Sequence, residues 1–179
     1  PNSVTVEIVM SEVPTLENYV NGQWGEPTTG NYIDVESPCD GSVIAKLPLS
    51  GADDVDAAVQ AAAEAFKSWS QVPVGRRVEP LFKLVQILRD NEEELARTLT
   101  REQGKSLPDA RAEMKRMIEN VEVACAAPIT QQGDKIMQVA GGIDGEVIRQ
   151  PIGVFGMIAP FNFPAMVPYW FVPYALATG

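Results

Sequence analysis

The pattern of apolar and polar positions changes twice along the chain. In residues 1–50, short apolar runs are separated by turn residues. The dipeptide Asn21-Gly22 lies between apolar flanks and predicts a β-hairpin, because both residues tolerate a positive φ. A second strand–turn–strand unit is predicted over residues 31–49, with Asp40-Gly41 in its turn. The chain is therefore expected to begin with short paired strands.

Three helical runs are predicted next. The first covers residues 51–70 and places a set of apolar side chains on one face: Val55, Ala58, Val59, Ala62, Phe66 and Trp69. The second covers residues 76–103, where Asn91 and Glu94 have the spacing of a capping box and predict a restart near Asp90. Gly104 is predicted to end that run. A third helix is predicted to begin at Ser106, capped with Asp109, and to stop by Pro128.

Strand signals return after Gly133. Two strands around a glycine-rich turn are predicted to form a ribbon over residues 133–150. Residues 153–160, "GVFGMIAP", are apolar on both sides and predict a buried parallel strand. A helix is predicted after Pro164. This order indicates an α/β fold with three parts, residues 14–132, residues 133–150 and an incomplete strand–helix unit over 151–179.

Composition removes several classes of function. The 179 residues carry a net charge of −10, which argues against a nucleic-acid-binding face. The chain has no histidine and only two cysteines, Cys39 and Cys125, so no metal site is expected. Four prolines between Pro160 and Pro173 argue against a membrane span. The first residues lack a basic segment before an apolar run, so no signal peptide is expected and the cytoplasm is the default location.

Asn162 is the most unusual polar residue of the apolar C-terminal stretch. It lies between Phe161 and Phe163, at the end of the predicted parallel strand. One interpretation is that its amide caps the next helix or bonds loop backbone. The other is an oxyanion donor, because ligands of open α/β sheets lie beyond the carboxyl ends of the strands. The pattern leaves both open.

The stretch "RQPIGVFGMIAPFNFPAMVPYW" strongly resembles the aldehyde dehydrogenase superfamily, and within it the CoA-acylating methylmalonate-semialdehyde dehydrogenases. The string Pro160 to Pro168 is the most specific part of the match. "YVNGQW", "SPCDGSVIAKLPL", "AFKSWS" and "LTREQGKSLPDARAEMKR" support it, so the resemblance extends from about Thr15 to Gly179. It implies a Rossmann-type NAD-binding domain with a protruding oligomerisation hairpin.

The resemblance also implies that this chain corresponds to roughly the first third of the family chain. The nucleophilic cysteine, the general-base glutamate and the lysine that holds the adenine ribose of NAD are then expected beyond Gly179. Neither Cys39 nor Cys125 matches the nucleophile, and a buried inert thiol is expected for Cys125. The isolated chain is therefore expected to be inactive, although the whole family protein is a homo-oligomeric enzyme that uses NAD and, in this branch, CoA.

Three sets of site residues follow from the resemblance. Asn162 matches the family asparagine that donates to the thiohemiacetal oxyanion. Ile158, Ala159, Pro160 and Phe161 match the strand end that lines the NAD ribose and nicotinamide, although core packing is an alternative for Phe161. Arg116 matches the helix position implicated in holding a substrate carboxylate. Neighbouring charges on the same helix leave a solvated, salt-bridged face as the alternative for Arg116.

The sequence thus predicts the N-terminal part of an enzyme that converts a semialdehyde, CoA and NAD to acyl-CoA and NADH. An aldehyde dehydrogenase of a non-acylating branch, with water as the acyl acceptor, is the first alternative. A non-catalytic binding or assembly module is the second.

Overall fold

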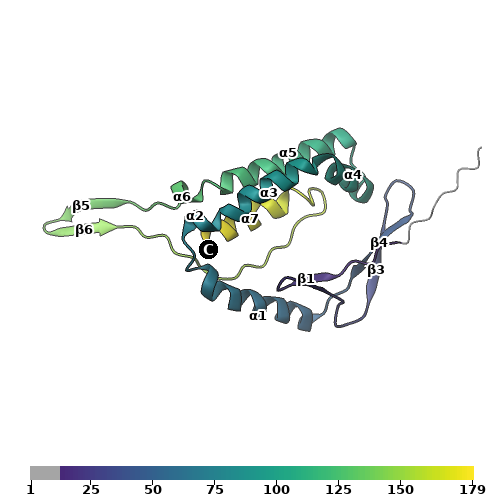
Figure 1. Cartoon of the computed structure of the whole chain (residues 1–179), viewed down its shortest axis with the longest axis horizontal. Helices are drawn as coiled ribbons and strands as arrows, with labels where there is room; N and C mark the ends of the chain where they lie inside the picture. Colours follow the sequence, from purple (N-terminus) through teal and green to yellow (C-terminus); the bar gives the residue numbers. More distant parts are fainter. Residues whose placement is uncertain (1–12) are drawn as a thin grey trace, which may run out of the picture.

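A layer of helices forms the larger part of the chain, whose computed structural model describes residues 13–179 (Figure 1). The chain order of the helical elements is α1 Ala52–Trp69, α2 Val74–Arg77, α3 Glu79–Asp90, α4 Glu92–Gln103, α5 Leu107–Ala124, α6 Ala127–Thr130, the 3₁₀ helix η1 Val167–Trp170 and α7 Val172–Thr178. Helix α5 is central, because it contacts α3, α4, η1 and α7. The C-terminal elements thus pack on the same helix as the middle of the chain.

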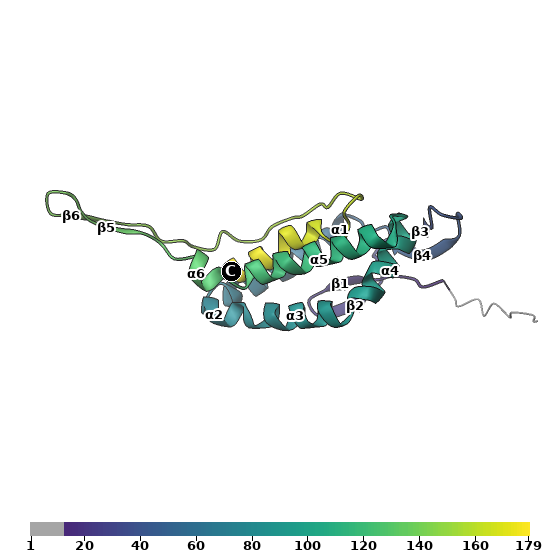
Figure 2. The same ribbon diagram turned by 90° about the horizontal axis from the view of Figure 1, so that it is seen from above.

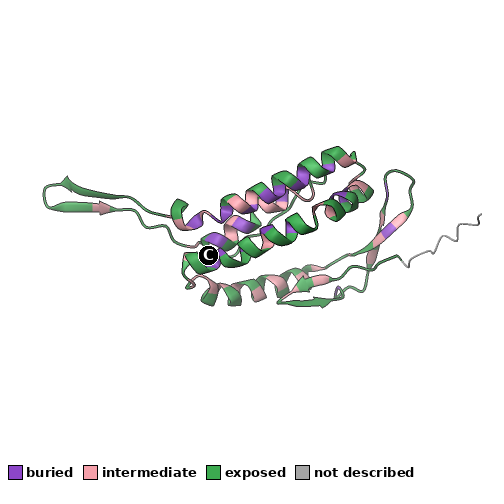
Figure 3. Cartoon of the chain, turned by 45° about the horizontal axis from the view of Figure 1, so that its top comes forward, coloured by how far each residue is buried: buried purple, intermediate pink, exposed green. Residues whose placement is uncertain are grey.

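The hydrophobic core lies between these helices. Figure 3 shows the buried residues concentrated there, whereas α1 and the ribbon are mostly exposed. The buried members of the core come from Val78, just before α3, and from elements between α3 and α7: Val78, Leu81, Val85, Leu88, Ala96, Leu99, Ala110, Met114, Met117, Ile118, Val121, Ala124, Cys125, Ala127 and Ala177. Burial of such side chains is the main force that holds the layer together.

Three separate antiparallel pairs of strands accompany the helices. Strand β1 (Asn18–Val20) pairs with β2 (Gln23–Gly25), and β3 (Tyr32–Glu36) pairs with β4 (Val43–Pro48). The third pair is β5 (Lys135–Ala140) with β6 (Ile143–Glu146). Both predicted hairpins of the N-terminal part are confirmed. The first turns at Asn21 (φ 51°) and Gly22 (φ 78°), as the dipeptide predicts.

The third pair forms the predicted ribbon, which extends away from the helices (Figures 1 and 2). Its register shifts between Ile136 and Ala140, and Gln138 within the shift has a φ of 53°. Most of its side chains are exposed, including the apolar Ile136, Met137 and Val139. The ribbon therefore has no cover from the rest of the described chain.

Three helix boundaries, at Asn91, Gly104 and Ser106, agree with the local signals. The run predicted over 76–103 also breaks at Val78, and α5 ends at Ala124, before Pro128. A junction at Asn91 separates α3 from α4, Gly104 ends α4 with a φ of 85°, and the Ser106 side chain accepts from the Asp109 amide at 3.3 Å. The predicted capping box of Asn91 is wrong. Its side-chain Nδ2 donates to the Ile87 carbonyl at 2.7 Å, so this amide serves the end of α3 rather than the start of α4.

The prediction of a buried parallel strand over residues 153–160 is wrong. This segment is extended but pairs with no other strand in the described part of the chain, and most of its residues are exposed. A parallel strand needs neighbouring strands to pair its backbone groups and helices to cover its faces. None of the strands of residues 13–179 lies beside it in the hydrogen-bonded order. The apolar pattern is thus present without the partners that would make it a strand.

Helix α1 shows a similar difference between pattern and packing. It forms over the predicted residues, yet Val55 and Val59 on its apolar face are exposed. Its C-terminal end is attached to the helical layer, where the Trp69 indole Nε1 donates to the Leu176 carbonyl at 2.9 Å. The predicted apolar residues therefore do share one face of α1, but much of that face is exposed.

Two sequence predictions concern other features of the chain. The prediction about a signal peptide falls mainly on residues 1–12, which lie outside the described residues. Among the helices of residues 13–179, none is both long enough and apolar enough to cross a lipid bilayer.

Candidate active site

The candidate site is built around the turn that contains Asn162. The extended segment over 151–160 ends in turns over residues 161–166, and η1 and α7 follow. Prolines at 160, 164, 168 and 173 restrict the backbone of this stretch and interrupt regular helix. The chain therefore packs on α5 through turns, the 3₁₀ helix η1 and the short helix α7 rather than through one continuous helix.

Helix α5 holds this turn through Glu113. Glu113 is only 3% exposed, and its carboxylate Oε1 accepts hydrogen bonds from the Ala165 and Met166 amides, both at 3.0 Å. Its Oε2 is paired with the Lys105 ammonium group. Lys105 also donates to the Asn162 carbonyl at 2.9 Å and lies over the Phe163 ring at 4.5 Å. The turn is thus attached to the helical layer at both of its ends.

A pocket of about 750 Å³ lies between α5 and this turn. Its lining combines charged and amide groups of the α4–α5 region with apolar side chains of the turn and η1: Gln103, Lys105, Asp109, Ala112, Glu113, Arg116, Asn120, Phe163, Met166 and Trp170. A volume of this order suits a small ligand. This arrangement can hold a small molecule that carries an anionic group.

Arg116 is the exposed cation of this pocket. Its guanidinium group pairs with Glu119 one helical turn later at 3.0 Å, and its backbone carbonyl accepts from Asn120 at 2.8 Å. The Glu119 pair is exposed, so its contribution to stability is small. Arg116 therefore lines the pocket while taking part in the surface ion pair that the sequence left as the alternative.

Asn162 is exposed, and neither neighbouring helix uses it as a cap. The N-cap residues are Met166 for η1 and Phe171 for α7. Within residues 13–179 its side-chain amide has no hydrogen-bond partner, whereas its carbonyl accepts from Lys105. The capping interpretation of Asn162 is therefore wrong, and its amide is free to serve a ligand.

The residues expected to line NAD lead directly into this turn. Ile158 is fully exposed and Phe161 is 85% exposed, so core packing is wrong for Phe161 in this structure. Ala159 and Pro160 between them are exposed as well. The segment presents its main chain and apolar side chains without any charge. Such a surface fits the apolar and backbone contacts that a dinucleotide would make, and the role of these residues stays a prediction.

The two cysteines are separate from this site. Cys125 is buried in the core, and burial, with the nearby Glu122 charge, raises the pKa of its thiol. A protonated buried thiol is a poor nucleophile, as expected for this position. Cys39 is exposed in the turn between β3 and β4. Residues 13–179 contain no cluster of three potential metal-ligating His, Cys, Asp or Glu side chains.

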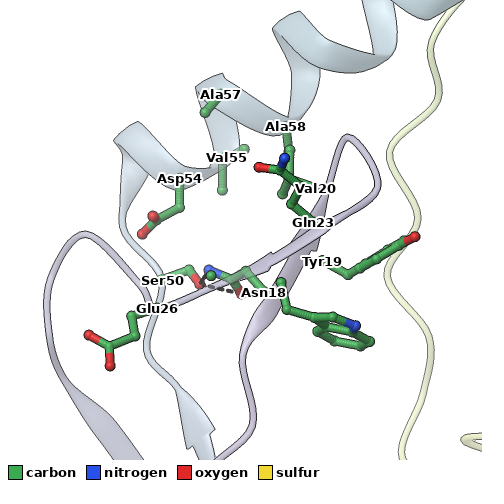
Figure 4. Close-up of a pocket in the computed structure, with 12 residues that line it drawn as sticks. Asn18, Tyr19, Val20, Gln23, Glu26, Ser50, Asp54, Val55, Ala57 and Ala58 are labelled. Atoms are coloured by element: carbon green, nitrogen blue, oxygen red, sulfur yellow. Dashed lines mark hydrogen bonds between the residues drawn. The ribbon is translucent and has the colours of Figure 1, made fainter.

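A second pocket, of about 490 Å³, lies between the first hairpin and α1 (Figure 4). Three of its polar side chains already have hydrogen-bond partners within the chain. Asn18 and Ser50 exchange hydrogen bonds, and the Asp54 carboxylate accepts from the Thr28 and Gly51 amides at 2.9 and 2.8 Å. These bonds lower the pKa of Asp54. This pocket is a joint between hairpin and helix and contains none of the predicted site residues.

Glu113 and Lys105 are the site residues that the sequence pattern did not single out. In the sequence, Glu113 is one of the charged neighbours of Arg116 that indicate a solvated, salt-bridged face. Arg111 and Glu122 of that face do form surface ion pairs, with Glu93 and Arg89 respectively. Glu113 instead shares the buried stripe of α5 with Ala110 and Met117. A carboxylate at core spacing, three residues after one buried position and four before another, was the available signal.

Comparison with known proteins gives the class of protein. The profile described as the aldehyde dehydrogenase family matches residues 24–179, which is most of the chain. The chain belongs to the aldehyde dehydrogenase family.

Within this family, the chain is similar to malonate-semialdehyde dehydrogenases. The chain is 47% identical over 170 residues to the malonate-semialdehyde dehydrogenase of Bacillus subtilis (strain 168), covering 95% of this chain and 35% of the relative. It is 45% identical over 172 residues to malonate-semialdehyde dehydrogenase 1 of Bacillus thuringiensis subsp. konkukian (strain 97-27), covering 96% and 35%. The chain thus spans about a third of the length of these curated relatives.

Solved structures give the same result. A methylmalonate-semialdehyde dehydrogenase from Oceanimonas doudoroffii superposes with a TM-score of 0.88 at 37% identity, covering 93% of this chain and 34% of that one. A protein from Sinorhizobium meliloti 1021, assigned to the same activity and complexed with NAD, has a TM-score of 0.87 at 35% identity, covering 92% and 34%. The predicted α/β fold class is confirmed by this likeness, whereas the three-part division of the chain stays a prediction.

Proposed function

We propose that this chain works as the N-terminal third of a longer NAD-dependent enzyme that oxidises malonate or methylmalonate semialdehyde to an acyl-CoA. The reaction converts semialdehyde, CoA and NAD to acyl-CoA and NADH. The observation that carries the proposal is the pocket of about 750 Å³ between α5 and the Asn162 turn, whose lining brings the Arg116 cation together with polar groups of α5 and with the apolar side chains of Phe163, Met166 and Trp170. The names of the relatives support the substrate class. Because this chain covers only 35% of each relative, their length supports a longer enzyme with further parts.

Two ends of the substrate are assigned to two residues of this chain. Arg116 is proposed to hold the carboxylate, because a planar guanidinium group matches two carboxylate oxygens. Asn162 is proposed to donate its side-chain amide to the oxyanion that forms when a thiol attacks the aldehyde. Such a donor stabilises the transition state by roughly 3–4 kcal/mol when it is held in place. The free amide of Asn162 supports this role.

The extended segment Ile158 to Phe161 is proposed to lie against the ribose and nicotinamide of NAD. Its neutral, apolar character and exposed main chain support the proposal. Bound NAD would accept the hydride. This chain contributes the surface that orients it, and the nucleophile and general base are proposed to lie in the rest of the enzyme. A cytoplasmic homo-oligomer is part of the same proposal.

An assay of the full-length enzyme tests the reaction. We expect NADH formation from malonate semialdehyde to require CoA and to yield an acyl-CoA. Turnover with water that yields the free acid would instead place the chain in a non-acylating branch. The 179-residue chain alone is expected to show no turnover, because Cys39 and Cys125 are not placed as nucleophiles. Turnover by the purified 179-residue chain that survives removal of both thiols would contradict the assigned roles.

The substrate end is tested with Arg116→Gln. We expect KM for malonate semialdehyde to rise at least about tenfold, since a charged hydrogen bond to the substrate is lost, while KM for propanal stays the same. The matched control is Arg89→Gln, because the Arg89 guanidinium pairs with Glu122 outside the pocket lining. Equal effects on both aldehydes would show that Arg116 does not recognise the carboxylate.

A further inference from the structure

The Asn162 turn is held by the buried ion pair of Lys105 and Glu113. Glu113 is almost fully buried, and the Lys105 side chain is only 12% exposed. Burying two charges removes their hydration, and the attraction between them often does no more than offset that loss. A buried pair is therefore a poor way to gain stability alone. In some proteins such a pair is retained because it fixes which groups meet.

The partners of this pair are backbone groups of one short stretch. Lys105 donates to the Asn162 carbonyl at 2.9 Å, and Glu113 accepts from the Ala165 and Met166 amides, each at 3.0 Å. The pair thus attaches one carbonyl before and two amides after Phe163. Side-chain bonds to backbone groups define the position of a turn independently of its side chains, so the Asn162 backbone is fixed with respect to α5.

The same helix carries the proposed carboxylate-binding residue. Arg116 follows Glu113 by three residues on α5, and both residues line the pocket of about 750 Å³. Residues three apart lie on neighbouring positions of one helix face. One rigid helix therefore connects the anchor of the Asn162 turn to the guanidinium group.

We propose that Lys105 and Glu113 are positioning residues, which hold the Asn162 turn on α5 and so set the spacing between the oxyanion donor and Arg116. This inference rests on the proposed function. The pair acts through Asn162 and contacts neither reacting group. Correct placement of a donor matters because small displacements cost large factors in rate.

The first test is a cycle of variants in the full-length enzyme. We expect Lys105→Met to lower kcat at least about tenfold when Asn162 is present, and less than about twofold in the Asn162→Ala background. A residue that acts through Asn162 has nothing left to position once the amide is removed. The matched control is Lys115→Met, an exposed lysine of α5, which is expected to leave kcat unchanged in both backgrounds. Equal factors in the two backgrounds would overturn the proposal.

The second test does not depend on activity. Hydrogen exchange in the 179-residue chain is expected to speed up at the Ala165 and Met166 amides in Glu113→Gln and in Lys105→Met, but not in Lys115→Met. Unchanged exchange at both amides in Glu113→Gln and Lys105→Met would overturn the anchoring role. This result does not depend on the kinetic variants of the full-length enzyme. If the full-length enzyme does not turn over a semialdehyde, the proposed function is wrong. The exchange result would still decide whether the ion pair holds the turn.

Discussion

The guanidinium group of Arg77 donates from Nε to the carbonyl oxygen of Ala177 at 3.0 Å, across 100 residues of sequence. Arg77 is buried, and its remaining contacts are also neutral oxygens, the Gln131 side chain at 3.2 Å and the Ser70 carbonyl at 3.4 Å. Desolvation lowers the pKa of Arg77. The cation lies at the C-terminal end of α7, where it complements the unpaired carbonyl groups of that helix.

We therefore expect Arg77→Met to reduce the free energy of unfolding of the chain by about 2 kcal/mol, because buried carbonyl groups lose a charged donor. The adjacent Arg76→Met is the matched control, since its guanidinium group is exposed and pairs with Glu79 at 2.7 Å. That change is expected to stay within about 0.5 kcal/mol. Urea unfolding followed by circular dichroism measures both. Equal losses would show that the Arg77 contacts do not hold α7.

A second prediction concerns acid stability. The hydrogen bond from Arg111 and its charge, followed by the hydrogen bond and charge of Arg97, lower the pKa of Glu93 to about 2. A carboxylate with a depressed pKa contributes stability that is complete above its ordinary pKa of 4.5 and is lost as the pH falls toward about 2. The difference in unfolding free energy between the parent chain and Glu93→Gln should therefore shrink across that window.

The partner variant provides the check for Glu93. Arg111→Gln removes the leading cause of the shift, so it should weaken the chain at pH 6 and show a smaller dependence on pH below 4.5. Unfolding by urea at several pH values measures this. If Glu93→Gln and the parent chain differ by the same amount at every pH, the α4–α5 ion pair does not contribute as the structure indicates.

A third prediction separates catalysis from stability at Asn162. In the full-length enzyme, Asn162→Ala should lower kcat about a hundredfold or more, with the Kd for NAD nearly unchanged, because an oxyanion donor acts in the transition state. Since this side chain is exposed and unpaired in the described chain, the same change should alter stability by less than about 0.5 kcal/mol. Asn91→Ala is the control, because that amide bonds only to the Ile87 carbonyl outside the pocket lining. An unchanged kcat with lower stability in Asn162→Ala would reverse the assignment.

The ribbon provides a fourth prediction. Residues 133–150 form a two-stranded ribbon with exposed apolar side chains, and an isolated pair of strands is marginal in water. We expect it to join a second subunit of the full-length enzyme, so Val147→Lys with Ile148→Lys should shift that enzyme toward monomers in sedimentation. Ile87→Lys, an exposed position of α3, is the control and should leave assembly unchanged. A fully oligomeric double variant would exclude the ribbon as the assembly element.

Local signals predicted much of this fold because their causes are local. Asn21-Gly22 turns the first hairpin through its own backbone freedom, and Gly104 and Ser106 set the boundary of two helices in the same way. Asn91 marks a boundary too, but a side-chain amide can bond to either adjacent helix, and here it serves the earlier one. The sequence therefore located the junction correctly and assigned the wrong partner.

Features that depend on distant partners could not be read in the same way. Residues 153–160 have the composition of a buried strand, yet a strand exists only where other strands pair with it. Glu113 was missed for the opposite reason, because a charged residue among charged neighbours usually faces solvent, whereas here Lys105 and two amides from the distant turn compensate its burial. Asn162 and Arg116 were found through resemblance, since spacing alone left their alternatives open.

The extended segment over residues 151–160 has a practical consequence for handling this chain. Its backbone N–H and C=O groups have no strand partner in the described structure, and it carries exposed Ile152, Phe155 and Ile158. Unpaired backbone beside apolar side chains is a template on which identical segments stack. We therefore expect the 179-residue chain to aggregate as its concentration rises, and we expect charged replacements in this segment to keep it dispersed for spectroscopy.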